Sequence, residues 1–311
     1  MSAEHDVAII GGGIAGLSAA LSIGRLGYSA ILLADGVPGG ELVKINQIDG
    51  IPGHEDGIAG YDLCPITQEQ AEQFGVIFTD HPAKGIAPSD DCWLVTSDES
   101  AIAARSVVIA SGTSLAKLDV PGVERLEGKG VSDCASCDAP LLRGKVAVVA
   151  GGGDSAMQEA LVLAEQLEKV IMVVRGEALS GQAAYKNSIL DHPKIECRFS
   201  SEPVEVIGDN VVTRVKIKNL VSGNEDDIAA DAIFTFIGLV PNTEFAGDSV
   251  KLDETGRINV DLFMRSSARG ICAVGNVRQA SPHRAAAAMG DATAAASALD
   301  MYLTSGKWRE T

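Results

Sequence analysis

The chain repeats one pattern, and this duplication constrains its fold more than any other feature. The first copy consists of an apolar run, a glycine turn, a helix-forming stretch and a second apolar run, at residues 6–10, 11–13, 15–26 and 30–33. The second copy has the same four parts at residues 146–149, 151–153, 155–167 and 170–174. Short apolar runs on both sides of a helix-forming stretch are typical of a β-α-β unit. The sequence therefore predicts two such units.

The distance between the copies indicates separate domains. Gly11 and Gly151 lie 140 residues apart, which is far longer than a solenoid repeat, and 311 residues suffice for about two domains. Further strand-like runs with polar breaks predict antiparallel or mixed pairing, at residues 94–96, 106–110, 211–219 and 232–237. A last strand at 270–274 precedes an alanine-rich helix at 285–302. Pro121, Gly122 and Pro241 place the domain crossings near residues 114–122 and 238–242.

The first glycine turn has the spacing of a dinucleotide-binding fingerprint. Gly11, Gly13 and Gly16 form G-x-G-x-x-G directly after a strand. The first glycine permits the tight turn, the second lets a pyrophosphate approach the backbone, and the third allows close helix packing. Asp35 follows the next strand, where an acid accepts hydrogen bonds from ribose hydroxyls. The alternative is a glycine turn that holds no ligand.

The second turn has the same fingerprint with one substitution. Gly151 and Gly153 are followed by Ala156, which is small enough for the third position. Arg175 stands where the first copy has Asp35. An arginine there suits the 2′-phosphate of NADP, although an arginine on a solvated turn is an equal alternative.

The cysteines contain one close pair. Cys134 and Cys137 form C-x-x-C, with Asp138 next to them as a proton donor or acceptor. Two cysteines at this spacing can form a reducible disulfide. A zinc site and an inert pair are the alternatives, but no second C-x-x-C or set of histidines is present to complete a zinc site. The other four, at 64, 92, 197 and 272, lie in or beside apolar runs and are expected to be ordinary buried thiols.

Net charge and hydropathy limit the kinds of partner and the cellular compartment that we expect for this protein. The formal net charge of −17 argues against nucleic acid and anionic membrane surfaces as partners. No run of about 18 uncharged apolar residues is present, and the beginning of the sequence does not have the pattern of a signal peptide. We therefore expect a cytoplasmic protein that does not bind membranes.

Together these motifs resemble the low-molecular-weight thioredoxin reductase family of flavoprotein disulfide oxidoreductases, over nearly the whole chain. The shared segments are residues 11–16, 39–42, 52–53, 111–113, 134–138, 151–156, 237–238, 241–243 and Gly275. The resemblance implies an α/β fold with two Rossmann-like dinucleotide-binding domains, the second inserted into the first. Residues 1–114 and 242–311 would form the FAD-binding domain, and residues 115–241 an inserted NAD(P)-binding-like domain that carries the cysteine pair.

The resemblance also implies roles for individual residues. Cys137 would be the sulfur next to the flavin, Cys134 the one that attacks the partner disulfide, and Asp138 the acid and base. The implied cofactor contacts outside the two fingerprints are Gly40, Glu41, Leu42, Gly112, Gly275, Asn276, His283 and Arg284. For His283, a surface position is the alternative. The family reorients its inserted domain, which would place hinges near Pro121 and Gly238.

The electron donor and the partner stay open at this stage. The resemblance implies a thioredoxin-like partner, a homodimer and NADPH as the donor. However, relatives that use NADPH have a histidine and several arginines where this chain reads Val174-Arg175-Gly176 and then Ser180. The alternatives are a ferredoxin-linked disulfide reductase, an oxygen-dependent oxidase of small dithiols, or a flavin-binding protein without turnover. The intact cysteine pair with Asp138 argues against the last of these.

Overall fold

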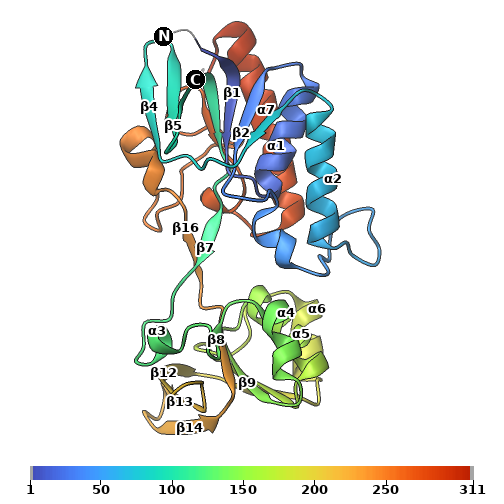
Figure 1. Cartoon of the computed structure of the whole chain (residues 1–311), viewed down its shortest axis with the longest axis vertical. Coiled ribbons are helices and arrows are strands. Elements are labelled where there is room, and N and C mark those ends of the chain that lie inside the picture. Colours follow the sequence, from blue (N-terminus) through green and yellow to red (C-terminus); the bar gives the residue numbers. More distant parts are fainter. Residues whose placement is uncertain (1–2, 309–311) are drawn as a thin grey trace. The chain divides into compact units, whose positions relative to one another are not determined.

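The computed structural model describes residues 3–308, which form two compact units (Figure 1). Unit 1 takes the described residues up to Ser114 and those from Val240 onward, and unit 2 is Leu115–Leu239. The chain thus leaves unit 1 once and returns to it once.

The sheet of unit 1 has seven strands. Its order is β3-β2-β1-β6-β5-β4, with β17 also paired to β6. Strands β3, β2, β1, β6 and β17 pair in parallel, and β4, β5 and β6 pair antiparallel. The strands are β1 (His5–Ile10), β2 (Ala30–Leu33), β3 (Ile77–Thr79), β4 (Gly85–Ser89), β5 (Cys92–Thr96), β6 (Ala101–Ile109) and β17 (Ile271–Ala273).

Helices cover one side of this sheet (Figure 1). They are α1 (Ile14–Arg25), α2 (Gly60–Glu72) and α7 (Ala285–Ser305), and the short 3-10 turns are η1 (Gly40–Lys44), η3 (Glu244–Ser249) and η4 (Gly275–Val277). Successive residues of β1 alternate between two cores: Val7 and Ile9 pack with the helices, and Ala8 and Ile10 pack on the opposite side. Burial on both faces explains why the parallel strands are continuous apolar runs rather than alternating ones.

Four strands of unit 2, β11-β10-β9-β15, follow the same order as β3-β2-β1-β6 of unit 1. Its sheet runs β11-β10-β9-β15-β8, with every pair parallel. A separate antiparallel sheet has the order β12-β13-β14. The strands are β8 (Val131–Ser132), β9 (Val146–Ala150), β10 (Lys169–Val173), β11 (Ile195–Arg198), β12 (Ser201–Ile207), β13 (Arg214–Asn219), β14 (Glu225–Ala229) and β15 (Ala232–Thr235).

The parallel sheet of unit 2 is also covered on both faces. On one face Val149, Met172 and Phe234 pack against the helices, and on the other Val148 and Ile171 share a core with the antiparallel sheet. The helical segments are α3 (Val123–Leu126), α4 (Ala135–Asp138), η2 (Ala139–Leu142), α5 (Asp154–Gln166) and α6 (Ala183–Leu190). Both sheets therefore confirm the predicted α/β class.

Two paired strands lie where the chain passes between the units. These are β7 (Thr113–Leu115) and β16 (Leu239–Pro241). Asn242 fixes the return to unit 1, because its side-chain amide donates to the Ser111 carbonyl at 3.0 Å and its backbone oxygen accepts from the Ser111 hydroxyl at 2.7 Å. The chain crosses between the units at residues 114–115 and 239–240, which lie in the expected segments 114–122 and 238–242. Pro121 itself lies inside unit 2, where its carbonyl accepts from Val206 N at 2.9 Å.

Other predicted elements differ in their bounds. The run at 211–219 forms a strand only from Arg214, and the run at 232–237 ends as a strand at Thr235. Their pairing is mixed, as predicted, because β13 is antiparallel to its neighbours and β15 is parallel. The closing helix extends to Ser305, where Gly306 ends it with a left-handed φ of 71°.

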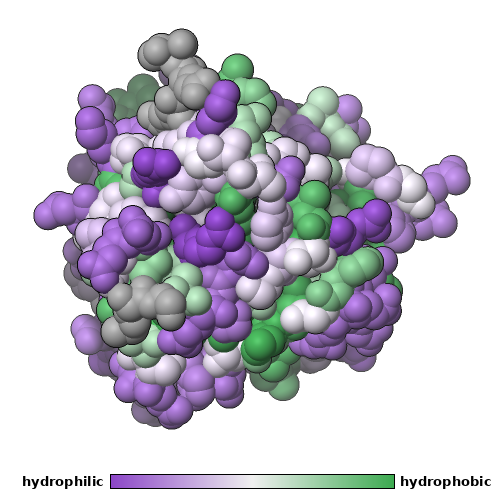
Figure 2. Space-filling model, turned by 90° about the horizontal axis from the view of Figure 1, so that it is seen from above, coloured by the Kyte–Doolittle hydropathy of each residue, from purple (hydrophilic) through white to green (hydrophobic). Residues whose placement is uncertain are grey.

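Hydrophilic residues cover most of the face that Figure 2 shows, with smaller hydrophobic groups between them. Among residues 3–308, no helix combines the length and the apolar character that a membrane span requires.

Candidate functional site

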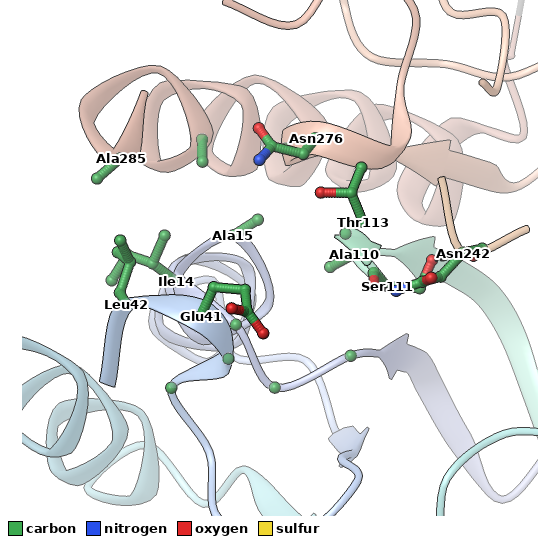
Figure 3. A pocket seen from close by; sticks show the side chains of 18 of the residues that line it. Ile14, Ala15, Glu41, Leu42, Ala110, Ser111, Thr113, Asn242, Asn276 and Ala285 are labelled. Carbon is green, nitrogen blue, oxygen red and sulfur yellow. Dashed lines mark hydrogen bonds between the residues drawn. The ribbon is translucent and has the colours of Figure 1, made fainter. Parts of the chain in front are cut away.

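A cavity of about 370 Å³ lies in unit 1 at the carboxyl ends of the parallel strands β1, β2, β6 and β17 (Figure 3). Ligands of doubly wound folds bind at this edge of the sheet. The cavity is lined by Gly11–Ala15, Ala34, Asp35, Val37, Gly39–Leu42, Ala110–Ser114, Asn242, Gly275, Asn276, His283–Ala285 and Ala288. These residues come from both ends of the chain, which unit 1 brings together.

The first glycine turn forms the floor of the cavity. Gly11 has φ +109°, and a side chain there would overlap the Ala110 carbonyl. A side chain on Gly16 would overlap the Gly11 oxygen, so this glycine lies behind the cavity and lets α1 pack against the turn. A Cβ at Gly13 would instead meet no protein atom within 4 Å. The backbone at Gly13 is thus open to a ligand.

The N-terminus of α1 is free to bind an anion. Gly13 is its N-cap and no side chain caps it, while Ile14 and Ala15 line the cavity. The first N–H groups of a helix have no partner within the helix, and they favour a phosphate. Asp35, exposed beyond β2, lines the same cavity, as the fingerprint predicts for a ribose contact.

The turn η1 supplies Gly40, Glu41 and Leu42 to the cavity. Gly39 precedes it with φ 140° and donates its N–H to the Gly12 carbonyl at 2.7 Å, so the two glycine turns are held together. Figure 3 shows Leu42 beside Ile14 at one end of the cavity, and Ser111 beside Asn242 at the other.

A buried ion pair supports the loop that carries Gly275 and Asn276. The Asp291 carboxylate, 7% exposed on α7, accepts from Gly275 N at 3.0 Å and from Arg278 Nε at 2.7 Å. Its other oxygen accepts from Arg278 Nη2 at 2.8 Å. Asn276 lines the cavity and accepts a hydrogen bond from the Ser281 hydroxyl at 3.2 Å. The loop geometry thus depends on Asp291, a residue that the sequence reasoning missed.

His283 and Arg284 line the cavity as well. His283 is exposed at the molecular surface and has a left-handed φ of 53°. Partial burial and the positive charges of Arg257, Arg284 and Arg278 lower the pKa of His283. These surroundings therefore favour the neutral form of the imidazole.

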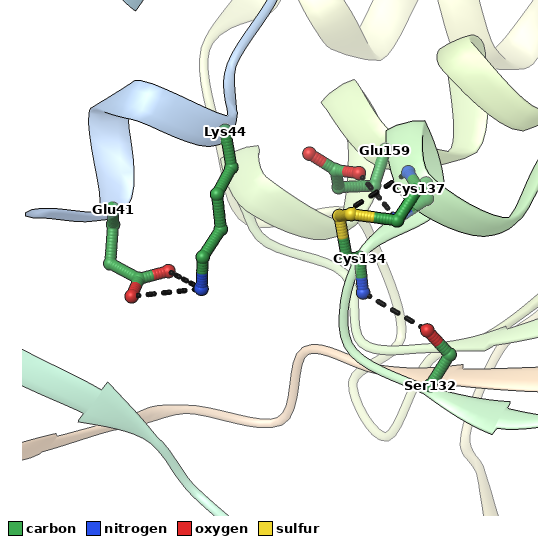
Figure 4. Close-up of a disulfide and its surroundings, with 7 residues drawn as sticks. Glu41, Lys44, Ser132, Cys134, Cys137 and Glu159 are labelled. Carbon is green, nitrogen blue, oxygen red and sulfur yellow. Dashed lines mark hydrogen bonds and ion pairs between the residues drawn. A yellow bond between two sulfur atoms is a disulfide. The ribbon is translucent and has the colours of Figure 1, made fainter. Parts of the chain in front are cut away.

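Cys134 and Cys137 form a disulfide in unit 2, with Cα atoms 5.4 Å apart (Figure 4). Cys134 is the N-cap of the short helix α4, and its sulfur accepts from Cys137 N at 3.3 Å. Cys134 N donates to the Ser132 hydroxyl at 3.2 Å. Cys134 and Asp138 are half-buried, and Cys137 is exposed. The pair is thus held on a short, ordered turn at the surface of its unit.

The second glycine turn has the geometry of the first. Gly151 has φ +137°, and a side chain there would overlap the Phe236 carbonyl. The N-terminus of α5 has Gly153 as an N-cap without a side-chain cap, and Ala156 is fully buried. Arg175, after β10, is exposed. This unit can therefore accept a dinucleotide phosphate at the same place in the β-α-β pattern.

The remaining cysteines are free thiols. Cys64, Cys92 and Cys272 are buried, as predicted, whereas Cys197 is only half-buried. Burial raises the pKa of the Cys64 thiol to about 11. Within the described part of the chain, no group of three or more His, Cys, Asp or Glu side chains is arranged to hold a metal ion.

The sequence reasoning missed two acidic residues that contact the predicted motifs, and both have the same signal in the sequence. Asp291 follows buried Ala288 and precedes buried Ala295 on α7, and Glu159 lies between buried Ala156 and Leu163 on α5. A charged residue at helical spacing within a buried apolar stripe is rare unless it has a partner. That signal could have identified both.

Comparison with known proteins identifies the family. The family model described as "Pyridine nucleotide-disulphide oxidoreductase" matches residues 5–292. The chain belongs to this family. A thioredoxin reductase from Treponema pallidum is 35% identical over 303 residues, covering 97% of this chain and 98% of that protein. The protein is a thioredoxin reductase-like flavin disulfide oxidoreductase, which confirms the resemblance.

Solved structures of pyridine nucleotide-disulphide oxidoreductases agree with this fold. The thioredoxin reductase of Lactococcus lactis in its FR conformation has a TM-score of 0.93 at 34% identity, over 96% of this chain and 99% of that chain. That of T. acidophilum has a TM-score of 0.91 at 31% identity, over 97% and 99%. A ferredoxin-flavin thioredoxin reductase from Clostridium acetobutylicum is also similar, with a TM-score of 0.52 at 25% identity over 96% and 98%.

Proposed function

We propose that this protein is an FAD-dependent oxidoreductase that passes electrons from a reduced nicotinamide nucleotide through the Cys134–Cys137 pair to a thioredoxin-like protein. The observation that carries the proposal is the surface disulfide on α4, in a chain whose other unit has a cavity lined by the first glycine fingerprint and Asp35. The names of the relatives, thioredoxin reductases, support the choice of partner.

The cavity of unit 1 fits FAD. The open backbone at Gly13 and the uncapped N-terminus of α1 suit the pyrophosphate, and Asp35 suits the ribose. Glu41, Leu42, Asn276 and His283 would contact the remainder of the cofactor. When bound, FAD supplies the two-electron transfer that connects a nicotinamide with a disulfide. Gly11, Gly40, Gly112, Gly275 and Arg284 complete the proposed lining, with Gly16 behind it.

The reduced cysteine pair would carry out thiol-disulfide exchange in two steps. The Cys134 thiolate attacks one sulfur of the partner disulfide, which forms a mixed disulfide and releases the partner's other sulfur as a thiolate. The Cys137 thiolate then attacks Cys134 Sγ, which restores the Cys134–Cys137 bond and releases the first partner sulfur. The N–H of Cys137, which lies 3.3 Å from Cys134 Sγ, favours Cys134 as the attacking thiolate.

Asp138 is proposed as the acid and base of this exchange. Asp138 directly follows Cys137 in the sequence, and its side chain is half-buried. The leaving thiolates of the partner need protons, and the thiols of the reduced pair must lose them. A carboxyl group next to the sulfurs can transfer both.

Unit 2 is proposed as the nucleotide-binding unit, within an inserted domain of residues 115–241. Gly151, Gly153 and Ala156 would hold the pyrophosphate, and Arg175 the 2′-phosphate of NADPH.

One observation favours a second candidate function. Arg175 is followed by Gly176 and the acidic Glu177, so the segment carries little positive charge for a 2′-phosphate. The second candidate is a flavoprotein of this fold that takes electrons from ferredoxin, as the Clostridium acetobutylicum relative is named, or that oxidises small dithiols with oxygen.

We further propose a cytoplasmic homodimer. Four free thiols outside the redox pair are compatible with a reducing compartment.

An anaerobic titration tests the donor. Protein with bound FAD is mixed with NADPH, then NADH, then dithiothreitol, and the flavin absorbance is followed. Loss of absorbance with NADPH or NADH supports the first candidate. Loss only with dithiothreitol, or only in a parallel sample that receives reduced ferredoxin, supports the second.

Two matched variants test the roles of the sulfurs. With a thioredoxin-like partner, Cys137→Ser is expected to trap a mixed disulfide through Cys134, and Cys134→Ser to trap none while keeping its flavin. Trapping only in Cys134→Ser would reverse the two roles. Disulfide reduction by Cys134→Ser at the rate of the unmodified protein would overturn the proposed function.

A further inference from the structure

The redox turn is the segment of residues 134–139, which carries Cys134 and Cys137. Glu159 is a charged residue on the face of α5 that packs against this turn. Its helical neighbours Ala156 and Ala160 are fully buried in the same core as Ala135 and Ala139 of the redox turn. Glu159 itself is half-buried. A carboxyl group in such a position needs a partner.

That partner is the backbone of the redox turn. Glu159 Oε2 accepts from Ala135 N at 3.2 Å. Ala135 directly follows Cys134, and Figure 4 shows the Glu159 carboxyl directed toward the turn that carries the disulfide. The bond links α5 to the residue beside the attacking sulfur, 24 positions away in the sequence.

Two groups therefore act on Cys134 in opposite directions. The Cys137 N–H, 3.3 Å from Cys134 Sγ, stabilises a negative charge on that sulfur. The Glu159 carboxylate is a negative charge close to the same turn and opposes a thiolate there. Burial raises the pKa of the Glu159 carboxyl, and the hydrogen bond from Ala135 offsets this only in part.

We propose that Glu159 is a positioning residue for the redox pair, which holds the turn through Ala135 and whose charge keeps the reduced Cys134 from ionising too readily. This proposal rests on the proposed function only in treating Cys134 and Cys137 as a redox pair. Without the negative charge of Glu159, the turn would stabilise the Cys134 thiolate, and with it the reduced pair, further. The pair would then give up its electrons less easily to a partner.

Titratable side chains on the elements packed against α5 are the other groups to be considered. Asp138 lies on α4, Tyr185 and Lys186 on α6, and Lys169 on β10, while β9 and η2 carry no titratable side chain. Lys169 forms an ion pair with Glu196, on the neighbouring strand β11. Asp138 is a carboxyl on the redox turn itself, so its contribution must be separated from that of Glu159 by experiment.

The test measures how readily Cys134 ionises in the full-length protein. Dithiothreitol reduces the disulfide, two thiols forming on the protein as the reagent closes to its cyclic disulfide. After its removal, iodoacetamide labels the thiols over a range of pH, and mass spectrometry follows the peptide that contains Cys134. Glu159→Gln keeps an oxygen that can accept from Ala135 N but removes the charge. We expect its labelling midpoint to fall by about one pH unit, the size typical of a neighbouring charge.

Control variants separate charge from structure. Glu165→Gln removes an exposed charge from the same helix and is expected to leave the midpoint unchanged. Glu159→Met, a second neutral variant, is expected to shift it in the same direction as Glu159→Gln, and Asp138→Asn measures the contribution of the other carboxyl. Circular dichroism checks that each variant is folded.

The proposal is overturned if both neutral variants at 159 are folded and label at the midpoint of the unmodified protein. Failure of the proposed function gives a different result. In that case Cys134 and Cys137 in the unmodified protein would not be reduced by dithiothreitol, or the reduced pair would not exchange with any disulfide.

Discussion

The two units share a strand order and a glycine turn, but they differ in what surrounds the turn. In both, the first glycine has a left-handed φ and lies against the backbone that follows a neighbouring strand. In unit 1 the turn opens into a cavity that Asp35 lines, and the buried Asp291 supports its far side. In unit 2 the same place after the second strand holds Arg175, and the helix after the turn holds Glu159 against the redox pair.

This difference shows which part of the pattern carries specificity. The turn and the helix N-terminus provide a phosphate site in either unit, because they use only backbone groups. The ligand is selected by side chains placed around that site. The same β-α-β unit can therefore serve as a flavin site in one half of a chain and as a support for a disulfide in the other.

The largest effect is expected from removing Asp291, which supports the loop that carries Gly275 and Asn276 in unit 1. Asp291→Ala leaves Arg278 buried without its partner and frees Gly275 N. We expect a loss of about 3–5 kcal/mol in unfolding free energy. Denaturant unfolding measures it, and flavin content should fall as well. Glu165→Ala, on the exposed surface of unit 2, is the control, and an equal loss in both variants would contradict the assignment.

The next largest effect is expected at the third position of the glycine fingerprint, which is Gly16 in unit 1 and Ala156 in unit 2. Gly16→Ala would push a methyl group into the Gly11 carbonyl, and the backbone must shift. We expect a cost of about 1–3 kcal/mol and weaker flavin binding, measured by flavin absorbance per protein. The reverse change in unit 2, Ala156→Gly, should cost about 1 kcal/mol and keep the flavin. Full flavin content in Gly16→Ala would show that the two turns are equally tolerant.

A smaller effect is expected at the acid of unit 1. Asp35→Asn weakens the hydrogen bonds that this side chain would accept from ribose hydroxyls but leaves the turn intact. We expect FAD affinity to fall about tenfold, measured by fluorescence titration of the apoprotein. Asp154→Asn, at the start of α5 in unit 2, should leave FAD affinity unchanged. Equal affinities for Asp35→Asn and the unmodified protein would remove Asp35 from the cofactor site.

The smallest effect concerns Arg175. An exposed charge contributes little, about 0.2–1 kcal/mol, so Arg175→Ala should raise the KM for NADPH no more than about fivefold and leave that for NADH unchanged. Steady-state kinetics with both nucleotides measures this. A rise of a hundredfold would show a phosphate clamp stronger than one exposed arginine can provide.

Much of the fold could be predicted because its signals are local. The apolar runs of β1 and β9, and the glycines after them, depend on backbone sterics and on burial of both sheet faces, which neighbouring residues encode. The cavity residues near Gly11 were predicted in the same way, whereas Gly40, Glu41 and Leu42 were predicted only from the resemblance to the family. Element ends were less predictable, because Pro121 and the start of β13 are fixed by contacts with Val206 and with neighbouring strands.

The sequence by itself determined the two β-α-β units and the C-x-x-C pair, since each depends on residues close together in the chain, and these motifs together indicated the family. Only the tertiary structure decided that Asp291 holds the Gly275 loop and that Glu159 holds the redox turn. Helical spacing indicates that a carboxylate faces the core, but the identity of its partner depends on how distant segments pack.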